Sequence, residues 1–152
     1  MCKESSFAAG ILPFTIFNGG LYFLLGLEAS NNKWSAFVGS SELGEIPQMT
    51  AYREFHEETA NVFKNRNTEL IQTNVIIDKT PSGKDVYIWY TEMKNVDFNI
   101  NEKFLRNKKI LSEKKYQEKK IIEWIHIDDL KMYSLLSSFK RVLAKLPPIH
   151  TT

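Results

Sequence analysis

Residues 39–58 read GSSELGEIPQMTAYREFHEE, a loop of small and polar residues that leads into a stretch without Gly or Pro after Pro47. Proline suits the first turn of a helix, where its missing amide hydrogen is not needed. Good helix formers continue over residues 48–62, so the stretch predicts a loop followed by a helix. Apolar positions at steps of three and four give this helix a face that can pack on a sheet: Ala51, Phe55, the methyl group of Thr59, and Val62.

Three carboxylates gather on another face of the predicted helix. Glu54, Glu57 and Glu58 stand at positions i, i+3 and i+4 and therefore project side by side. They would repel one another unless a cation lay between them. Hard oxygen ligands favour Mg²⁺ or Mn²⁺ over Zn²⁺. A solvated acidic helix face is the alternative interpretation.

The spacing of these residues resembles the Nudix box, the signature of the Nudix hydrolase family. Gly39 is followed after five residues by Glu45, and after seven more by residues 53–58, REFHEE. The match ends there, because Ala60 replaces the family glycine and Asn61 replaces an apolar residue. Relatives also often carry glycine where this chain has Val38, which makes the loop bulkier.

The resemblance implies a fold and an activity. The fold is an α/β/α sandwich in which the box helix and a C-terminal helix pack on a mixed sheet. The activity is metal-dependent hydrolysis of a diphosphate bond in a nucleoside diphosphate linked to another moiety, as in a pyrophosphatase acting on phosphoric anhydrides. Glu54, Glu57 and Glu58 would bind Mg²⁺ or Mn²⁺ together with a carbonyl group near Gly39. Glu45 would complete the metal site directly or through water.

The resemblance also implies a supporting residue, a base and one more metal ligand. Arg53 would hold a carboxylate in register. In relatives a further glutamate precedes a strand that carries tryptophan, and Glu118, six residues before Trp124, is our candidate. Glu113 and Glu123 are the alternative candidates for this ligand. For each of the three acids, the other interpretation is a solvated charge in a lysine-rich loop. The general base is Glu57, Glu58 or Glu118, and the sequence does not choose among them.

The rest of the chain predicts an α/β arrangement around this helix. Asn and Gly at residues 18–20 are a strong hairpin signal between two apolar stretches. Two Pro residues at 147–148 end the last predicted helix. We expect strands at residues 7–17, 21–27, 34–38, 69–77, 86–93 and 121–127, a loop with at most a short helix at 101–120, and a helix from Asp128 through Leu146.

Length and composition set further bounds. The chain has 152 residues and a formal net charge of +2. This size suits one domain over residues 1–152, and the charge is too small for a surface that binds nucleic acid as a whole. Cys2 is the single cysteine, which excludes an intramolecular disulfide and agrees with a cytoplasmic location. No apolar stretch approaches the roughly 20 residues of a membrane helix, so no membrane partner is expected.

Substrate contacts are harder to place. Trp34 and Phe37 can stack on a nucleobase, although most such aromatic residues belong to a core. Residues 103–120 are rich in lysine, and Lys119 and Lys120 could contact phosphates. This stretch favours capped RNA (decapping) or an inositol pyrophosphate as alternatives to a small phosphorylated nucleotide, unless it is a solvated loop. The rival from another class is a non-catalytic module that binds a ligand or RNA.

Overall fold

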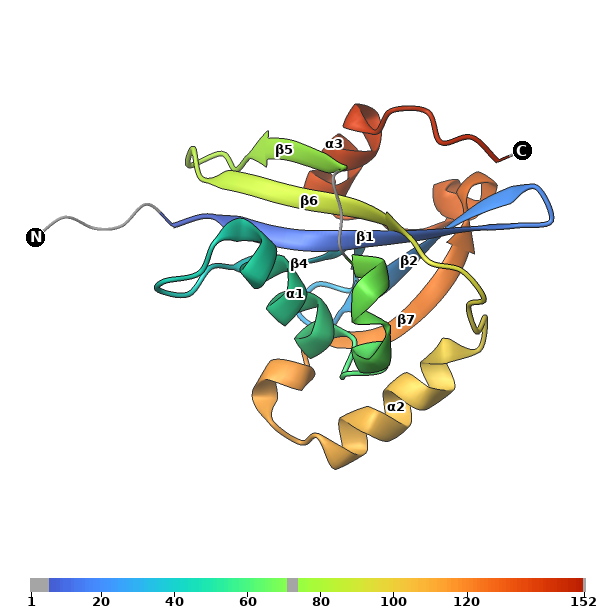
Figure 1. Cartoon of the computed structure of the whole chain (residues 1–152), viewed down its shortest axis with the longest axis horizontal. Coiled ribbons are helices and arrows are strands. Elements are labelled where there is room, and N and C mark those ends of the chain that lie inside the picture. Colours follow the sequence, from blue (N-terminus) through green and yellow to red (C-terminus); the bar gives the residue numbers. More distant parts are fainter. Residues whose placement is uncertain (1–5, 71–73, 152) are drawn as a thin grey trace, which may run out of the picture.

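The structure is a computed structural model that describes residues 6–70 and 74–151. Within these residues seven strands form one mixed sheet (Figure 1). The order β3-β2-β1-β6-β5 runs across the sheet, while β4 pairs with β1 and β7 pairs with β2. The strands are β1 (Ala8–Phe17), β2 (Gly20–Glu28), β3 (Trp34–Ser35), β4 (Phe37–Ser40), β5 (Val75–Lys79), β6 (Asp85–Glu92) and β7 (Lys119–His126).

Strand β1 lies at the centre and has neighbours along both edges. One edge pairs in parallel with β6. The other edge pairs antiparallel with β4 in its first half and with β2 in its second half. The predicted hairpin between β1 and β2 is present, with Asn18 and Gly19 at φ of 49° and 74°. Both turn residues thus adopt the positive φ values that a tight hairpin turn requires.

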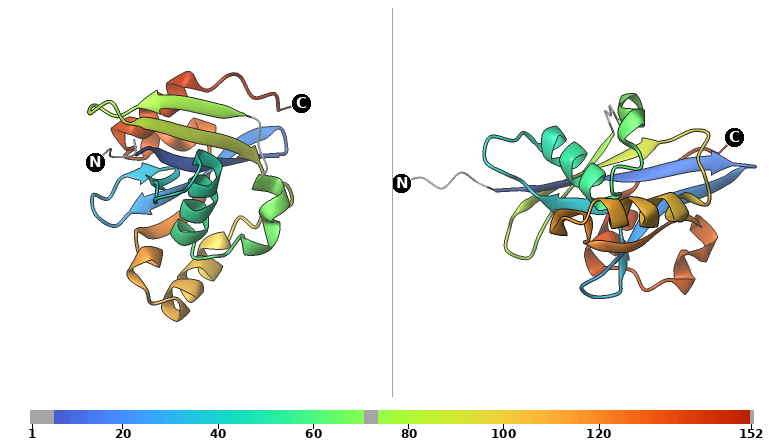
Figure 2. Two further views of the ribbon diagram at one scale, coloured as in Figure 1. Left: turned by 60° about the vertical axis from the view of Figure 1, so that its left-hand side comes forward. Right: turned by 90° about the horizontal axis from the view of Figure 1, so that it is seen from below.

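Helices cover both faces of the sheet, as the α/β/α prediction requires. Helix α1 (Pro47–Glu58) packs on one face, and helix α3 (Ser137–Lys145) packs on the other (Figure 1 and Figure 2). Neighbouring side chains of β1 alternate between two cores. Ile11 lies in the core under α1, whereas Leu12 lies in the core under α3.

Helix α1 begins at Pro47 as predicted, but it ends at Glu58 and not at Val62. Ala60 and Asn61 adopt φ of 50° and 59°, a left-handed conformation that closes the helix. Ala60 is the residue that replaces the family glycine, so this chain keeps the glycine-like turn without a glycine. The predicted extension was wrong because propensity does not reveal a left-handed alanine.

The segment predicted as a loop contains a full helix, α2 (Ile100–Ile110), of eleven residues. Ile100 and Phe104 stand one turn apart and are both buried, which fixes one face of α2 in the core under α1. The Asn101 side chain also accepts a hydrogen bond from the Ile122 amide of β7. Tertiary contacts therefore stabilise a helix whose sequence shows weak periodicity.

Two other predicted boundaries were also wrong. The predicted helix from Asp128 is a 3₁₀ helix (Ile127–Met132) and the separate helix α3. Trp34 separates these two helices. Its amide donates a hydrogen bond to the Ser134 carbonyl and its carbonyl accepts one from the Leu136 amide, which holds residues 134–136 extended. The strand expected from Glu69 begins at Val75, after a 3₁₀ helix (Lys64–Leu70); residues 71–73 of that prediction lie outside the described residues. Among the described residues no helix has the length and apolar character needed to cross a membrane.

Candidate metal centre

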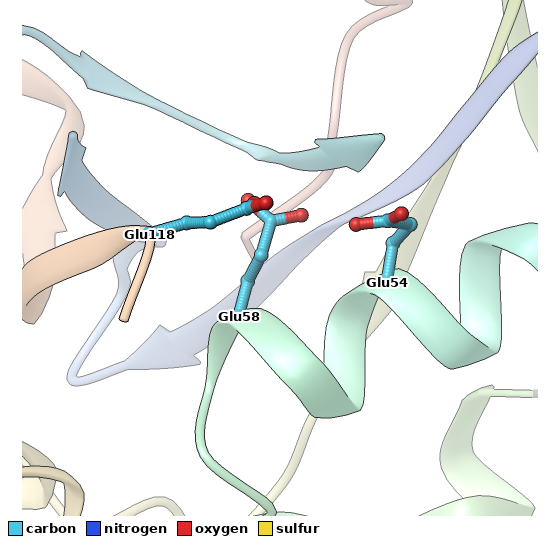
Figure 3. A group of neighbouring side chains, drawn as sticks. All are labelled: Glu54, Glu58 and Glu118. Atoms are coloured by element: carbon cyan, nitrogen blue, oxygen red, sulfur yellow. The ribbon is translucent and has the colours of Figure 1, made fainter. Parts of the chain in front are cut away.

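Three glutamates converge at the C-terminal half of α1. Glu54 and Glu58 rise from the same side of α1, one turn apart, and Glu118 reaches toward them from the residue before β7 (Figure 3). One carboxylate oxygen of each lies within 4.8 Å of the other two. Glu54 and Glu58 are buried, whereas Glu118 is exposed, so solvent reaches the group from the Glu118 side.

The group fits a divalent cation for two reasons. Glu58 is only 2% exposed, and its Oε2 atom has no hydrogen-bond partner among the described residues, which is an expensive arrangement unless a cation is bound there. Gly39 lies so close to Glu54 that a methyl group on Gly39 would overlap its carboxylate. Carboxylate oxygens are the donors that Mg²⁺ and Mn²⁺ prefer.

Burial dominates the acidity of the three carboxyl groups. It raises the pKa of Glu58 well above the usual range, and the Lys119 ammonium only partly opposes this. It also raises the pKa of Glu54 against the opposing effect of Arg53. Although Glu118 as a residue is exposed, partial desolvation of its carboxyl group raises its pKa, and repulsion from Glu57 adds to this effect. A bound cation would relieve the same unfavourable charge.

Arg53 joins the loop before α1 to the helix itself. Its Nε and Nη2 atoms donate to the two oxygens of Glu45 at 2.7 and 2.9 Å, and Nη2 also donates to the Ser40 carbonyl at 2.9 Å. Its Nη1 atom donates to Glu54 Oε1 at 2.9 Å and to Glu57 Oε2 at 3.4 Å. A planar guanidinium can hold several carboxylates at once in this way.

Glu45 is engaged entirely by protein donors. Besides Arg53, its Oε1 atom accepts hydrogen bonds from Thr50 Oγ1 and from the Glu42 amide, each at 2.8 Å. The Arg53 hydrogen bond is the main reason why the pKa of Glu45 falls from 4.5 to about 2. In this arrangement Glu45 braces the loop, and its predicted metal contact stays a prediction.

The remaining candidate acids lie outside the group of three. Glu57 is half-buried and contacts Arg53. Glu113 is exposed and lies 3.9 Å from Lys115 Nζ. Glu123 accepts a hydrogen bond from the Tyr133 hydroxyl at 3.2 Å. Of the three acids considered for the last ligand, Glu118 is therefore the one that the structure brings to Glu54 and Glu58.

Comparison with known proteins shows the family to which the chain belongs. Residues 7–146 match the NUDIX domain family. The chain belongs to the Nudix family. A relative from Acanthamoeba polyphaga mimivirus, itself uncharacterized, is 32% identical over 133 residues, which make up 82% of this chain and 41% of the relative. The Nudix chain thus spans about two fifths of the length of that protein.

Solved structures share the Nudix fold with this chain. An Ap4A hydrolase of C. elegans, in a binary complex, superposes with a TM-score of 0.57 at 19% identity, covering 91% of this chain and 98% of the other. The NUDIX domain of Shewanella oneidensis NrtR, complexed with ADP ribose, gives 0.62 at 12% identity, covering 94% and 86%. The C-terminal domain of mouse MUTYH gives 0.60 at 10% identity, covering 93% and 86%. At these identities the likeness shows the fold alone.

The four residues predicted to contact substrate lie in different surroundings. Phe37 is fully buried, and its ring packs edge-on against Phe55 with centroids 5.4 Å apart. Trp34 is half-buried and meets the Tyr133 ring at 5.2 Å. Lys120 is exposed and donates to the Asn32 side chain. Lys119 is 1% exposed. Phe37 and Lys119 are thus buried, whereas the Lys120 side chain and part of Trp34 face solvent.

A cavity of about 230 Å³ lies between the sheet and α3 of the Nudix fold. Its walls are mostly small or apolar, including Ala8, Ala36 and Val86 from the sheet. A second hollow of about 340 Å³ contains Glu58 and Glu118, and the two share Glu28 and Val38 in their walls. The candidate metal centre therefore adjoins an apolar cavity.

Glu28 is a further residue of this site that was not predicted from the sequence. It ends β2, forms part of both cavities and lies 3.6 Å from the Lys119 ammonium. A single acid at the end of a strand carries no spacing signal, so only the pairing of β2 with β7, which brings Glu28 opposite Lys119, reveals it.

Proposed function

We propose that this Nudix domain hydrolyses a diphosphate bond in a nucleoside diphosphate linked to another moiety, with Mg²⁺ or Mn²⁺ as cofactor. The observation that supports this most strongly is the convergence of the Glu54, Glu58 and Glu118 carboxylates, together with a buried Glu58 oxygen that has no hydrogen-bond partner within residues 6–70 and 74–151. A purely structural acidic cluster would leave this oxygen unsatisfied, at a cost in stability.

Each residue has a role in the proposal. Glu54, Glu58 and Glu118 would hold the metal, with the Gly39 carbonyl and Glu57 as further ligands. When bound, the metal supplies charge neutralisation at the diphosphate and makes a water nucleophilic near neutral pH. Arg53 keeps the loop and α1 in register around the carboxylates.

The general base is proposed among the acids that water can reach. Glu58 is 2% exposed and has one oxygen 3.7 Å from an ammonium group, whereas Glu57 is half-buried and Glu118 is exposed. A base must meet the attacking water within hydrogen-bond distance. This supports Glu57 or Glu118 over Glu58 as the residue that accepts the proton.

The cavity beside the metal centre supports a substrate with an apolar or aromatic portion. Its small-residue walls leave about 230 Å³, and it shares Glu28 and Val38 with the hollow around Glu58. Two structural neighbours are named for Ap4A and for ADP ribose, which agrees with a nucleotide as substrate. We therefore propose that the base or sugar enters the cavity while the diphosphate lies at the carboxylates.

A substrate panel tests the proposal. Purified protein with Mg²⁺ or Mn²⁺ should release phosphorylated products from at least one nucleoside diphosphate derivative, and EDTA should stop the reaction. Glu57→Gln should abolish turnover without changing the unfolding midpoint. A broad panel left uncleaved, with nucleotides, capped RNA and inositol pyrophosphates all included, would sink the proposal. Ligand binding without turnover would favour the non-catalytic module.

A second candidate substrate class is supported by the charge of α2. Lys103, Arg106 and Lys109 are exposed on this helix. Its C-terminal end is tied to the metal-centre segment, because Lys108 Nζ donates to the Lys119 carbonyl at 2.6 Å. This basic helix, tied at its C-terminal end to the residue that follows Glu118, supports capped RNA or an inositol pyrophosphate as substrate. Affinity for uncapped RNA that falls steeply with salt would favour the cap.

The proposal extends to the chain as a whole. We take residues 1–152 as one Nudix-like hydrolase domain, which the family match over residues 7–146 supports. A cytoplasmic location is also part of the proposal, since the one cysteine of the chain suits a reducing compartment. Imaging of the tagged protein in cells tests this location.

A further inference from the structure

A buried ammonium group lies behind the metal centre. Lys119 is 1% exposed, and its Nζ atom is 3.6 Å from Glu28 Oε1 and 3.7 Å from Glu58 Oε1. The same atom donates a hydrogen bond to Ser35 Oγ at 2.8 Å. Lysine is almost never buried this completely unless it is paired, so two carboxylates and a hydroxyl account for its place.

The surrounding strands are shaped to admit this side chain. The Lys119 side chain packs against Gly26 of β2, and a Cβ atom at Gly26 would be 2.7 Å from Lys119 Cδ. The ammonium group lies 5.6 Å from the centre of the Phe37 ring, and the Ala36 carbonyl accepts a further hydrogen bond at 3.3 Å. A buried charged side chain for which the neighbouring strands leave space indicates a specific role for the charge.

The two oxygens of Glu58 have different surroundings. Oε1 faces Lys119, whereas Oε2 has no hydrogen-bond partner among the residues that the structure describes. The Oε1 atom of Glu58 is thus already paired with the positive charge of Lys119, which also lies beside Glu28. Glu58 also belongs to the group of three with Glu54 and Glu118, in which one carboxylate oxygen of each residue lies within 4.8 Å of the other two.

We propose that Lys119 is a built-in counter-cation that takes the place of a metal ion between Glu28 and Glu58. It is a positioning residue: it orients Glu58 and restricts the divalent cation to the Glu54–Glu58–Glu118 side. The inference rests on the proposed function only in that these carboxylates bind a divalent cation. Lys119 is accordingly not a substrate contact.

The electrostatic consequence can be measured. The Lys119 ammonium group and the proposed metal ion would both lie beside Glu58, so the two positive charges would repel each other in a region that little water reaches. Removing the Lys119 charge should strengthen metal binding by at least about tenfold, because at an effective dielectric constant of about 20 even one unit charge several ångströms away contributes more than one tenfold step in affinity. An exposed lysine has a much smaller effect, because water and salt screen it.

The test compares two lysines that are adjacent in β7. Lys119→Met removes the buried charge, and Lys120→Met removes an exposed one. Titration calorimetry of the metal-free proteins with Mn²⁺ should show at least about tenfold tighter binding, or a second bound ion, for Lys119→Met. Lys120→Met should stay within about twofold of the wild type. A Lys119→Met protein with unchanged or weaker Mn²⁺ affinity and the same stoichiometry would overturn the inference.

Two further measurements do not depend on the folding of Lys119→Met. Lys119→Gln also removes the charge but keeps N–H donors for Ser35 and Ala36, and it should show the same gain in affinity. In wild-type crystals soaked in Mn²⁺, the anomalous signal should lie at Glu54, Glu58 and Glu118, with Lys119 still between its carboxylates. A signal between Glu28 and Glu58, with Lys119 displaced, would contradict the inference.

The outcome is separable from that of the proposed function. Mn²⁺ binding is measured without substrate, so a difference between Lys119→Met and Lys120→Met supports the inference even where no substrate is cleaved. Conversely, hydrolysis by the wild type combined with equal Mn²⁺ binding by both variants overturns the inference alone. A wild-type protein that binds no Mn²⁺ overturns both.

Discussion

The carboxylate of Glu54 rests directly against the backbone of Gly39, at a distance that leaves no room for a Cβ atom on residue 39. We therefore expect Gly39→Ala to displace Glu54 from the group of three. Mn²⁺ affinity, measured by calorimetry, should fall by about tenfold or more, because one of three charged ligands is lost. Hydrolysis of the best substrate should fall with it.

Ser40→Ala is the matched control for Gly39→Ala. It is the next residue of β4, its side chain is exposed, and the substitution keeps the carbonyl that accepts from Arg53. We expect it to retain wild-type metal affinity. Full activity of Gly39→Ala would show that the loop moves freely and that its close contact with Glu54 is unimportant.

Three glutamates that are near one another in sequence should differ sharply when neutralised. Glu118→Gln should weaken Mn²⁺ binding by about tenfold or more, since Glu118 is the one that lies with Glu54 and Glu58. Glu113→Gln and Glu123→Gln should stay within about twofold, because these side chains contact Lys115 and Tyr133 instead. Equal losses in all three variants would point to a diffuse electrostatic effect.

Arg53→Lys should impair the site although the charge is kept. An ammonium group cannot make the paired hydrogen bonds to Glu45 and also reach the Ser40 carbonyl and Glu54. We expect turnover to fall by about tenfold or more and the free energy of unfolding to fall by about 1–2 kcal/mol, measured in urea. Arg106→Lys, on the exposed face of α2, is the control and should change neither quantity.

The pKa of Glu45 predicts how stability depends on pH. In the folded protein this pKa falls from 4.5 to about 2, mainly through the Arg53 hydrogen bond. A lowered folded-state pKa contributes stability above pH 4.5, and this contribution is lost as the pH falls toward 2. Glu45→Gln should therefore be less stable than the wild type at pH 7, and the difference in urea midpoint should narrow between pH 4.5 and 2. A constant difference would show that Glu45 acts without its charge.

Local sequence signals were sufficient for the centre of the fold. The Asn18-Gly19 turn and Pro47 carry strong local preferences, so the β1–β2 hairpin and the start of α1 were predicted correctly. The family resemblance added the sheet and the layers. Helix α2 was missed because its stability comes from Ile100 and Phe104 in the core, which sequence periodicity hardly shows.

Residue spacing alone predicted only the part of the site that is contiguous in sequence. Glu54 and Glu58 follow from helical spacing, and Glu118 was placed by the resemblance. The partnership of Glu28 with Lys119 depends on the register of β2 against β7, which brings residues 91 positions apart in the chain opposite each other. No local pattern encodes that register, so the lysine was assigned to substrate when it is buried behind the carboxylates.

The register of β4 against β1 decides which residue of β4 faces the candidate metal centre. Ala9 opposite Gly39 turns residue 39 toward α1 and Glu54. Because side chains alternate along a strand, a shift of one residue would present Val38 or Ser40 to Glu54 instead. Inserting or deleting a single residue within β4 should thus abolish metal binding and the proposed hydrolysis while leaving the sheet assembled. In this protein, the register of the short strand β4 matters to the site as much as the identity of the acidic residues themselves.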